Sequence, residues 1–162
     1  MSLKHAVPAL LLLLAATFAL AAGAVGEKLP TLKLRDLENQ DVGAEAHAGK
    51  PRIYVFFMTW SPGSKALLAE LKPLAPKLRE KDVAVYAVSL DLAGAAKVAD
   101  FVKKEGLSGF PVLLAEQSAS RALNLKHFPT TLAVDAAGTI QARLDGAARA
   151  ADVEAMVAKL KP

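Results

Sequence analysis

Two serines stand three positions apart in the segment Trp60-Ser61-Pro62-Gly63-Ser64, directly after a run of apolar residues. A serine hydroxyl becomes a nucleophile when a neighbouring base takes its proton, and His127 is the candidate base for Ser61. Such a hydrolase also needs an acid that orients the histidine and a set of oxyanion donors, and the sequence signals neither. The simpler interpretation is that Ser61 caps a helix whose first residue is Pro62, a favoured start worth about 1 kcal/mol.

The sequence contains no cysteine, which excludes thiol chemistry, disulfides and thiolate metal sites. Only His47 and His127 follow the first 24 residues, and no cluster of carboxylates accompanies them. We therefore predict neither a metal nor a cofactor. The net charge is +4, and basic residues are interleaved with acidic ones along the chain, so we expect no nucleic-acid binding.

Residues 1–24 have the pattern of an export signal. Lys4 makes the start basic, Ala6 to Ala22 is uncharged and apolar, and two Ala-x-Ala sites are available at residues 19–21 and 22–24. The alternative is an uncleaved membrane anchor, but the apolar run falls short of the roughly 20 residues that span a bilayer. We predict a cleaved signal, export to the periplasm or cell envelope, and one domain over residues 25–162.

The apolar pattern predicts alternating strands and helices behind an N-terminal hairpin at residues 31–42. Residues 52–58 form a near-continuous apolar run, which is typical of a central strand covered on both faces. A helix is predicted over 65–80, with its start signal at Ser61. Further strands are predicted over 83–90, 111–114, 131–135 and 139–144, and further helices over 94–105, 118–123 and 150–160. This order predicts an α/β three-layer sandwich, in which helices cover both faces of a mixed, mostly parallel central sheet.

These segments resemble the TlpA/ResA group of exported thioredoxin-like proteins from about Leu29 to Leu160. The strand that leads into Thr59-Trp60-Ser61-Pro62-Gly63-Ser64-Lys65 resembles the family's strand and its Trp-Cys-x-x-Cys motif. Residues 83–91 resemble the second core strand of the family, and residues 101–104 and 110–114 resemble the helix and strand that the group adds to a minimal thioredoxin. Residues 128–138 resemble the segment that holds the family's cis-proline.

The resemblance implies thiol–disulfide exchange as the family's activity, and that reaction needs a thiolate at the helix start. Here Ser61 stands at the position of the first cysteine and Ser64 at that of the second. The family often has an acid six residues before the first cysteine or three after the second, where this chain has the apolar Val55 and Leu67. The resemblance therefore implies a thioredoxin-like domain without redox activity.

The resemblance also implies a peptide-binding edge, at which Pro129 is a cis-proline facing the Ser61 loop and the backbone beside it pairs with an extended segment. We expect a redox-inactive protein that binds protein segments in the cell envelope and meets a membrane only through an uncleaved N-terminal segment. The alternatives are a thiol-disulfide oxidoreductase whose cysteines were mutated and a serine hydrolase that uses Ser61. The predicted binding residues are Trp60, Pro62, Gly63, Phe128, Pro129 and Thr130.

Overall fold

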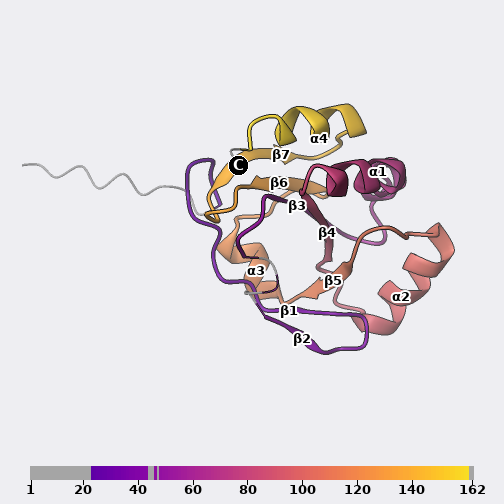
Figure 1. Ribbon diagram of the computed structural model, residues 1–162. Coiled ribbons are helices and arrows are strands. Elements are labelled where there is room, and N and C mark those ends of the chain that lie inside the picture. Colours follow the sequence, from indigo (N-terminus) through magenta and orange to yellow (C-terminus); the bar gives the residue numbers. More distant parts are fainter. Residues whose placement is uncertain (1–22, 44–45, 47, 161–162) are drawn as a thin grey trace, which may run out of the picture.

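The computed structural model describes residues 23–43, 46 and 48–160 (Figure 1). The predicted export signal lies outside the described residues except for its last two, Gly23 and Ala24. His47 also lies outside them.

One sheet of seven strands runs through the described residues in the order β2-β1-β5-β4-β3-β6-β7 (Figure 1). Strand β3 lies inside the sheet, and all six of its residues are buried, as the apolar run predicts. Its side chains alternate between two separate apolar clusters, with Ile53, Val55 and Phe57 on one face and Tyr54 and Phe56 on the other. The strands are β1 (Leu34–Arg35), β2 (Asp41–Val42), β3 (Arg52–Phe57), β4 (Ala84–Ser89), β5 (Val112–Ala115), β6 (Thr130–Val134) and β7 (Ile140–Asp145).

The sheet is mixed, as predicted, but the prediction that it is mostly parallel is wrong. Among the described strands, β3–β4 and β4–β5 pair in parallel, whereas β1–β2, β1–β5, β3–β6 and β6–β7 pair antiparallel. The prediction followed the strand–helix–strand order in the middle of the chain. The hairpins β1–β2 and β6–β7 supply two of the antiparallel pairings, because a tight turn reverses the direction of the strand that follows it. Each hairpin also joins the parallel strands in the antiparallel sense, through β1–β5 and β3–β6.

Helices cover both faces of the sheet, as predicted (Figure 1). Buried residues of α1, α2 and α4 pack against one face, and α3 packs against the other together with the chain before β1. Helix α2 ends at Gly106, whose left-handed φ of 59° suits glycine as a C-terminal cap. The helices are α1 (Pro62–Glu80), α2 (Gly94–Glu105), α3 (Gln117–Ala122) and α4 (Ala150–Val157).

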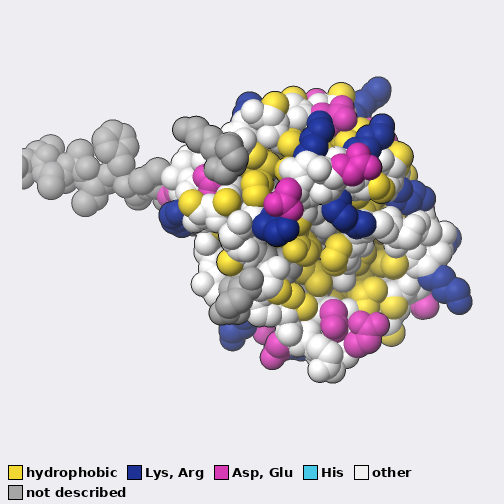
Figure 2. All heavy atoms as spheres, in the orientation of Figure 1, with side chains coloured by type: hydrophobic (Ala, Val, Ile, Leu, Met, Phe, Trp, Pro, Cys, Tyr) yellow, Lys and Arg dark blue, Asp and Glu magenta, His cyan; other side chains and the backbone are white. Residues whose placement is uncertain are grey.

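The surface carries both signs of charge. On the face shown in Figure 2, Lys and Arg side chains are interspersed with Asp and Glu and are not gathered into one stripe. Within the described part of the chain, no helix combines the length and the apolar character that crossing a membrane requires.

Helix α1 holds the site described below against the sheet, so its buried face controls the stability of the domain. Leu71 is fully buried on that face, whereas Leu92 is 85% exposed. We expect Leu71→Ala to lower the free energy of unfolding by about 2–5 kcal/mol, because it removes buried methyl groups and leaves a cavity. Leu92→Ala is the matched control and should cost less than about 0.5 kcal/mol. Urea denaturation measures both, and equal losses would contradict this packing.

Candidate functional site

Helix α1 begins at the two serines. Ser61 is the N-cap, with an extended backbone at φ −79° and ψ 119°, and Pro62 occupies the first turn. The Ser61 Oγ accepts a hydrogen bond from the backbone N–H of Ser64 at 3.3 Å. The predicted capping role of Ser61 is therefore confirmed, and the cap satisfies one of the free N–H groups of the helix start.

The loop before β6 lies directly against this helix start. The peptide bond between Phe128 and Pro129 is cis. The Ser61 hydroxyl donates a hydrogen bond to the Phe128 carbonyl oxygen at 3.0 Å. A Cβ atom at Gly63 would lie 3.3 Å from Pro129 Cδ, so only glycine allows this approach without a local shift. The structure thus brings Ser61, Gly63, Phe128 and Pro129 together.

The two hydrogen bonds of Ser61 define what its hydroxyl does. The hydroxyl donates its proton to the Phe128 carbonyl oxygen, and its oxygen accepts from the Ser64 N–H. It therefore links the start of α1 to the cis-proline loop. An activated nucleophile would instead donate its proton to a base. His127 has an exposed side chain, and its carbonyl oxygen accepts from the Thr130 hydroxyl at 2.7 Å. This geometry supports a structural role for Ser61 and does not support a hydrolase.

The second serine faces the core behind the motif. Ser64 is fully buried, and its Oγ lies 3.5 Å from the Met58 backbone N, at the limit of a hydrogen bond. Val55 and Leu67, at the positions where the family often has an acid, are both fully buried in the apolar cluster. Neither of these side chains can accept or deliver a proton.

Thr131 lies next to Val55 across the β3–β6 pairing. Its Oγ1 is buried and has no hydrogen-bond partner among the described residues. An unpaired buried hydroxyl costs about 1–3 kcal/mol, so this position is a local weakness of the core.

Trp60 stands on the outer side of the helix start. Its side chain is 70% exposed, whereas Phe128 is half-buried and Pro129 is buried. Trp60 borders a shallow groove over α2 that includes apolar Phe101 and basic Lys65, Lys97 and Lys104. This groove does not include Phe128 or Pro129, so the shelf predicted from Trp60, Phe128 and Pro129 stays a prediction.

Asp91 positions the loop before the motif, and the sequence analysis missed it. Its carboxylate accepts hydrogen bonds from the Thr59 backbone N–H at 2.8 Å, from the Thr59 hydroxyl at 3.0 Å and from the Ser89 hydroxyl at 2.8 Å. The available signal was Ser89 and Asp91, two polar residues on either side of Leu90 at the end of a buried strand. Because Thr59 precedes Trp60, these bonds fix the chain where it enters the site.

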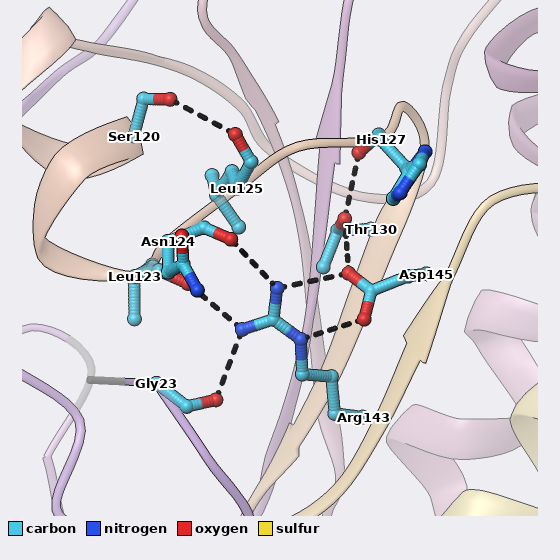
Figure 3. A network of polar contacts seen from close by, with 9 residues as sticks. All are labelled: Gly23, Ser120, Leu123, Asn124, Leu125, His127, Thr130, Arg143 and Asp145. Carbon is cyan, nitrogen blue, oxygen red and sulfur yellow. Dashed lines mark hydrogen bonds and ion pairs between the residues drawn. The ribbon is translucent and has the colours of Figure 1, made fainter. Parts of the chain in front are cut away.

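A polar network supports the cis-proline loop from the other side (Figure 3). The Thr130 hydroxyl lies 2.9 Å from Asp145 Oδ1 and 2.7 Å from the His127 carbonyl oxygen. The Arg143 guanidinium donates to both oxygens of Asp145, at 2.9 Å each. These bonds from Arg143, together with the Thr130 hydroxyl, hold the pKa of Asp145 below its ordinary value. Thr130 therefore supports the loop rather than offering its hydroxyl to a ligand.

The described residues contain no group of three or more His, Asp or Glu side chains placed to hold a metal ion.

The link from Ser61 to the cis-proline loop predicts a stability effect. We expect Ser61→Ala to lower the free energy of unfolding by about 1–2 kcal/mol, because it removes a helix cap and a hydrogen bond to a carbonyl. Ser64→Ala is the matched control and should cost less, since the Oγ of Ser64 makes only the long contact to Met58. Chemical denaturation of the two variants measures the difference, and an equal cost would contradict the bonding described for Ser61.

The depressed pKa of Asp145 predicts a dependence of stability on pH. A carboxyl whose pKa is lower in the folded protein stabilises the fold above its unfolded pKa of about 3.9, and this contribution is lost as the pH falls through the folded pKa. Asp145→Asn should therefore be less stable than the wild type at pH 7, and the difference should shrink below about pH 4. Thermal unfolding across this range tests the effect, and a difference that stays constant with pH would refute it.

Comparison with known proteins supports both the thioredoxin-like fold and the relationship of this chain to the TlpA/ResA group. A model of the AhpC/TSA family matches residues 25–143. The thiol-disulfide oxidoreductase ResA of Geobacillus kaustophilus (strain HTA426) is 27% identical over 144 residues, which cover 87% of this chain and 80% of that protein. The ResA protein of Bacillus thuringiensis (strain Al Hakam) is 26% identical over 139 residues, covering 85% of this chain and 79% of that protein.

Solved structures share the fold. A putative thiol:disulfide interchange protein DsbE from Chlorobium tepidum superposes with a TM-score of 0.72 at 22% identity, covering 84% of this chain and 94% of that one. A secreted Mycobacterium tuberculosis disulfide oxidoreductase homologous to E. coli DsbE gives a TM-score of 0.67 at 19% identity, covering 80% of this chain and 96% of that one. With its thioredoxin-like sheet and its cis-proline loop beside Trp60-Ser61-Pro62-Gly63-Ser64, the chain belongs to the AhpC/TSA family, as a TlpA/ResA-like thioredoxin-fold protein.

Proposed function

We propose that this protein binds extended protein segments at the cis-proline edge and carries out no thiol–disulfide exchange. One observation carries the proposal: the cis-proline loop lies against the helix start although the whole chain contains no cysteine. Exchange requires a thiolate that attacks a disulfide, and a serine hydroxyl cannot take that role. Binding requires only the backbone edge and the apolar side chains around it.

The hydrogen bonds of the loop indicate how a segment would pair. The carbonyl oxygens of His127, Phe128 and Pro129 already accept bonds from Thr130, Ser61 and Gly146. Among the described residues, the backbone N–H of Phe128 has no partner. A bound segment would therefore offer a carbonyl oxygen to the Phe128 N–H and place an apolar side chain against Trp60 or Phe128.

The second candidate is a thiol-disulfide oxidoreductase whose two cysteines were replaced by serine. The names of the relatives favour it, since the matched ResA proteins are called thiol-disulfide oxidoreductases. The apolar Val55 and Leu67 oppose it, because replacing two cysteines would have left an acidic partner in place. The serine hydrolase alternative has no support from the relatives. It is also opposed by the Ser61 hydroxyl, which donates its proton to the Phe128 carbonyl oxygen and not to a base.

We place this binding function outside the cytoplasm, in the periplasm or cell envelope, with protein segments of that compartment as partners. The signal pattern of residues 1–24 supports export. The similarity to a Mycobacterium tuberculosis protein described as secreted supports it further. The interspersed surface charges give no reason to propose a nucleic-acid partner.

Trp60 is the single tryptophan of the chain, so its fluorescence reports directly on the proposed site. We expect unstructured peptides with apolar side chains to shift its emission to shorter wavelength, because binding removes the exposed ring from water. Phe128→Ala should weaken binding by about tenfold, as the loss of a central aromatic contact does in protein interfaces. Val25→Ala is a control on an exposed apolar side chain outside the site and should not change the affinity. Unaltered emission at saturating peptide would overturn the proposal.

Thiol chemistry can be tested separately with insulin reduction. The wild-type chain should show no dithiol-dependent turnover, because it contains no sulfur that could be reduced or oxidised at this site. The double variant Ser61→Cys with Ser64→Cys should form a disulfide but reduce insulin slowly, since Val55 and Leu67 provide no proton transfer. Real turnover by the wild type would contradict the redox-inactive assignment. Rapid turnover by the double variant would favour the second candidate.

A further inference from the structure

The chain before β1 is part of the folded domain. The N–H of Gly26 donates to the Ile140 carbonyl oxygen, and the N–H of Ile140 donates to the Glu27 carbonyl oxygen, both at 2.8 Å. The N–H of Leu29 donates to the Gly138 carbonyl oxygen at the same distance. Residues 26–29 thus pair with residues 138–140, at the start of β7 and the turn before it, and cover backbone groups that would otherwise be exposed there.

Gly23 ends this docked segment in a tight niche. It is buried, and its φ of +81° lies in the left-handed region that favours glycine. A Cβ atom there would lie 2.7 Å from the Leu123 carbonyl oxygen and 3.0 Å from Arg143 Nη1. Only glycine therefore fits the position, which makes Gly23 a residue that the fold itself requires.

Arg143 binds Gly23 within the network that supports the cis-proline loop (Figure 3). Its Nη1 donates to the carbonyl oxygens of Gly23 at 3.0 Å and Leu123 at 2.8 Å. Its Nη2 donates to the Asn124 carbonyl oxygen at 3.1 Å and to Asp145 at 2.9 Å. With Gly23 in place, the Arg143 side chain is only 16% exposed.

These contacts discriminate between the two Ala-x-Ala sites, and they favour the first site over the second, whose use would give the domain over residues 25–162 expected from the sequence. Cleavage after Ala24 would remove Gly23, empty its niche and take one acceptor from a mostly buried guanidinium. Cleavage after Ala21 keeps the niche filled and the network complete. Export by itself gives no reason for a glycine at position 23, whereas the fold does.

We infer that the export signal is cut between Ala21 and Ala22, so that the mature chain begins at Ala22. The inference rests on the export component of the proposed function. In the reaction, a signal peptidase adds water across this peptide bond, which leaves the Ala21 carboxylate on the signal and a new amino group on Ala22. Small residues at positions 19 and 21 satisfy the requirement of the enzyme.

The first test is the intact mass of the protein recovered from the periplasm of a bacterium that expresses the full chain. A mass that corresponds to a start at Ala22 supports the inference. A start at Val25, another start or an uncut chain overturns it. Ala21→Leu should block the normal cut, and the matched variant Ala24→Leu should leave it unchanged. Peptide binding is read from Trp60 in a different assay, so its failure is distinguishable from a failure of processing.

A second test uses Gly23→Val, which leaves both Ala-x-Ala sites intact and creates no third one. If the mature protein keeps residue 23, this variant should unfold several degrees below the wild type, because valine is strained at this φ and its Cβ meets the Leu123 carbonyl. If processing removes residue 23, the mature variant is identical to the wild type and shows no shift, which overturns the inference. Residue 25 stays in the mature chain whichever site is cut, so Val25→Ala is the neutral control.

Discussion

The hydrogen bond from the Ser61 hydroxyl to the Phe128 carbonyl oxygen joins the two halves of the site. It connects the start of α1 with the loop before β6, segments 67 residues apart in the chain. The close approach of Gly63 to Pro129 depends on the same alignment. Each half has its own support, since Asp91 fixes the loop before Trp60 and Asp145 fixes Thr130. The site is thus a junction between the end of β3 and the start of β6, in which the hydroxyls of Thr59, Ser61 and Thr130 are engaged in structural hydrogen bonds.

This junction explains how a fold associated with redox chemistry can keep its shape without cysteine. A serine cap satisfies the helix start as well as any other good N-cap residue, so α1 needs no cysteine to begin there. The chemistry is lost because a hydroxyl forms no disulfide and because the space behind Ser64 is lined by apolar Val55 and Leu67. The exposed ring of Trp60 and the free N–H of Phe128 remain available to a ligand. The proposed binding function requires no more than these remaining groups.

Local sequence signals predicted the elements of the fold closely. Ser61-Pro62 marked the true start of α1, and Gly106 marked the true end of α2, because caps depend on the conformation of single residues. The sheet was wrongly predicted to be mostly parallel. Local sequence does not reveal in which direction each hairpin joins the parallel strands, because that pairing is made between distant segments. The Arg143–Asp145 pair was missed for a similar reason. Its partners, Gly23, Leu123 and Thr130, come from distant segments that only the folded sheet brings together.

Amide NMR during a peptide titration tests the central claim most directly. If the cis-proline edge is the binding site, the largest shifts should be those of the Phe128 backbone amide and the Trp60 indole N–H. The Ser64 amide should move little, because its bond to the Ser61 cap is retained. Shifts confined to another surface, with the Phe128 amide unchanged, would contradict the account.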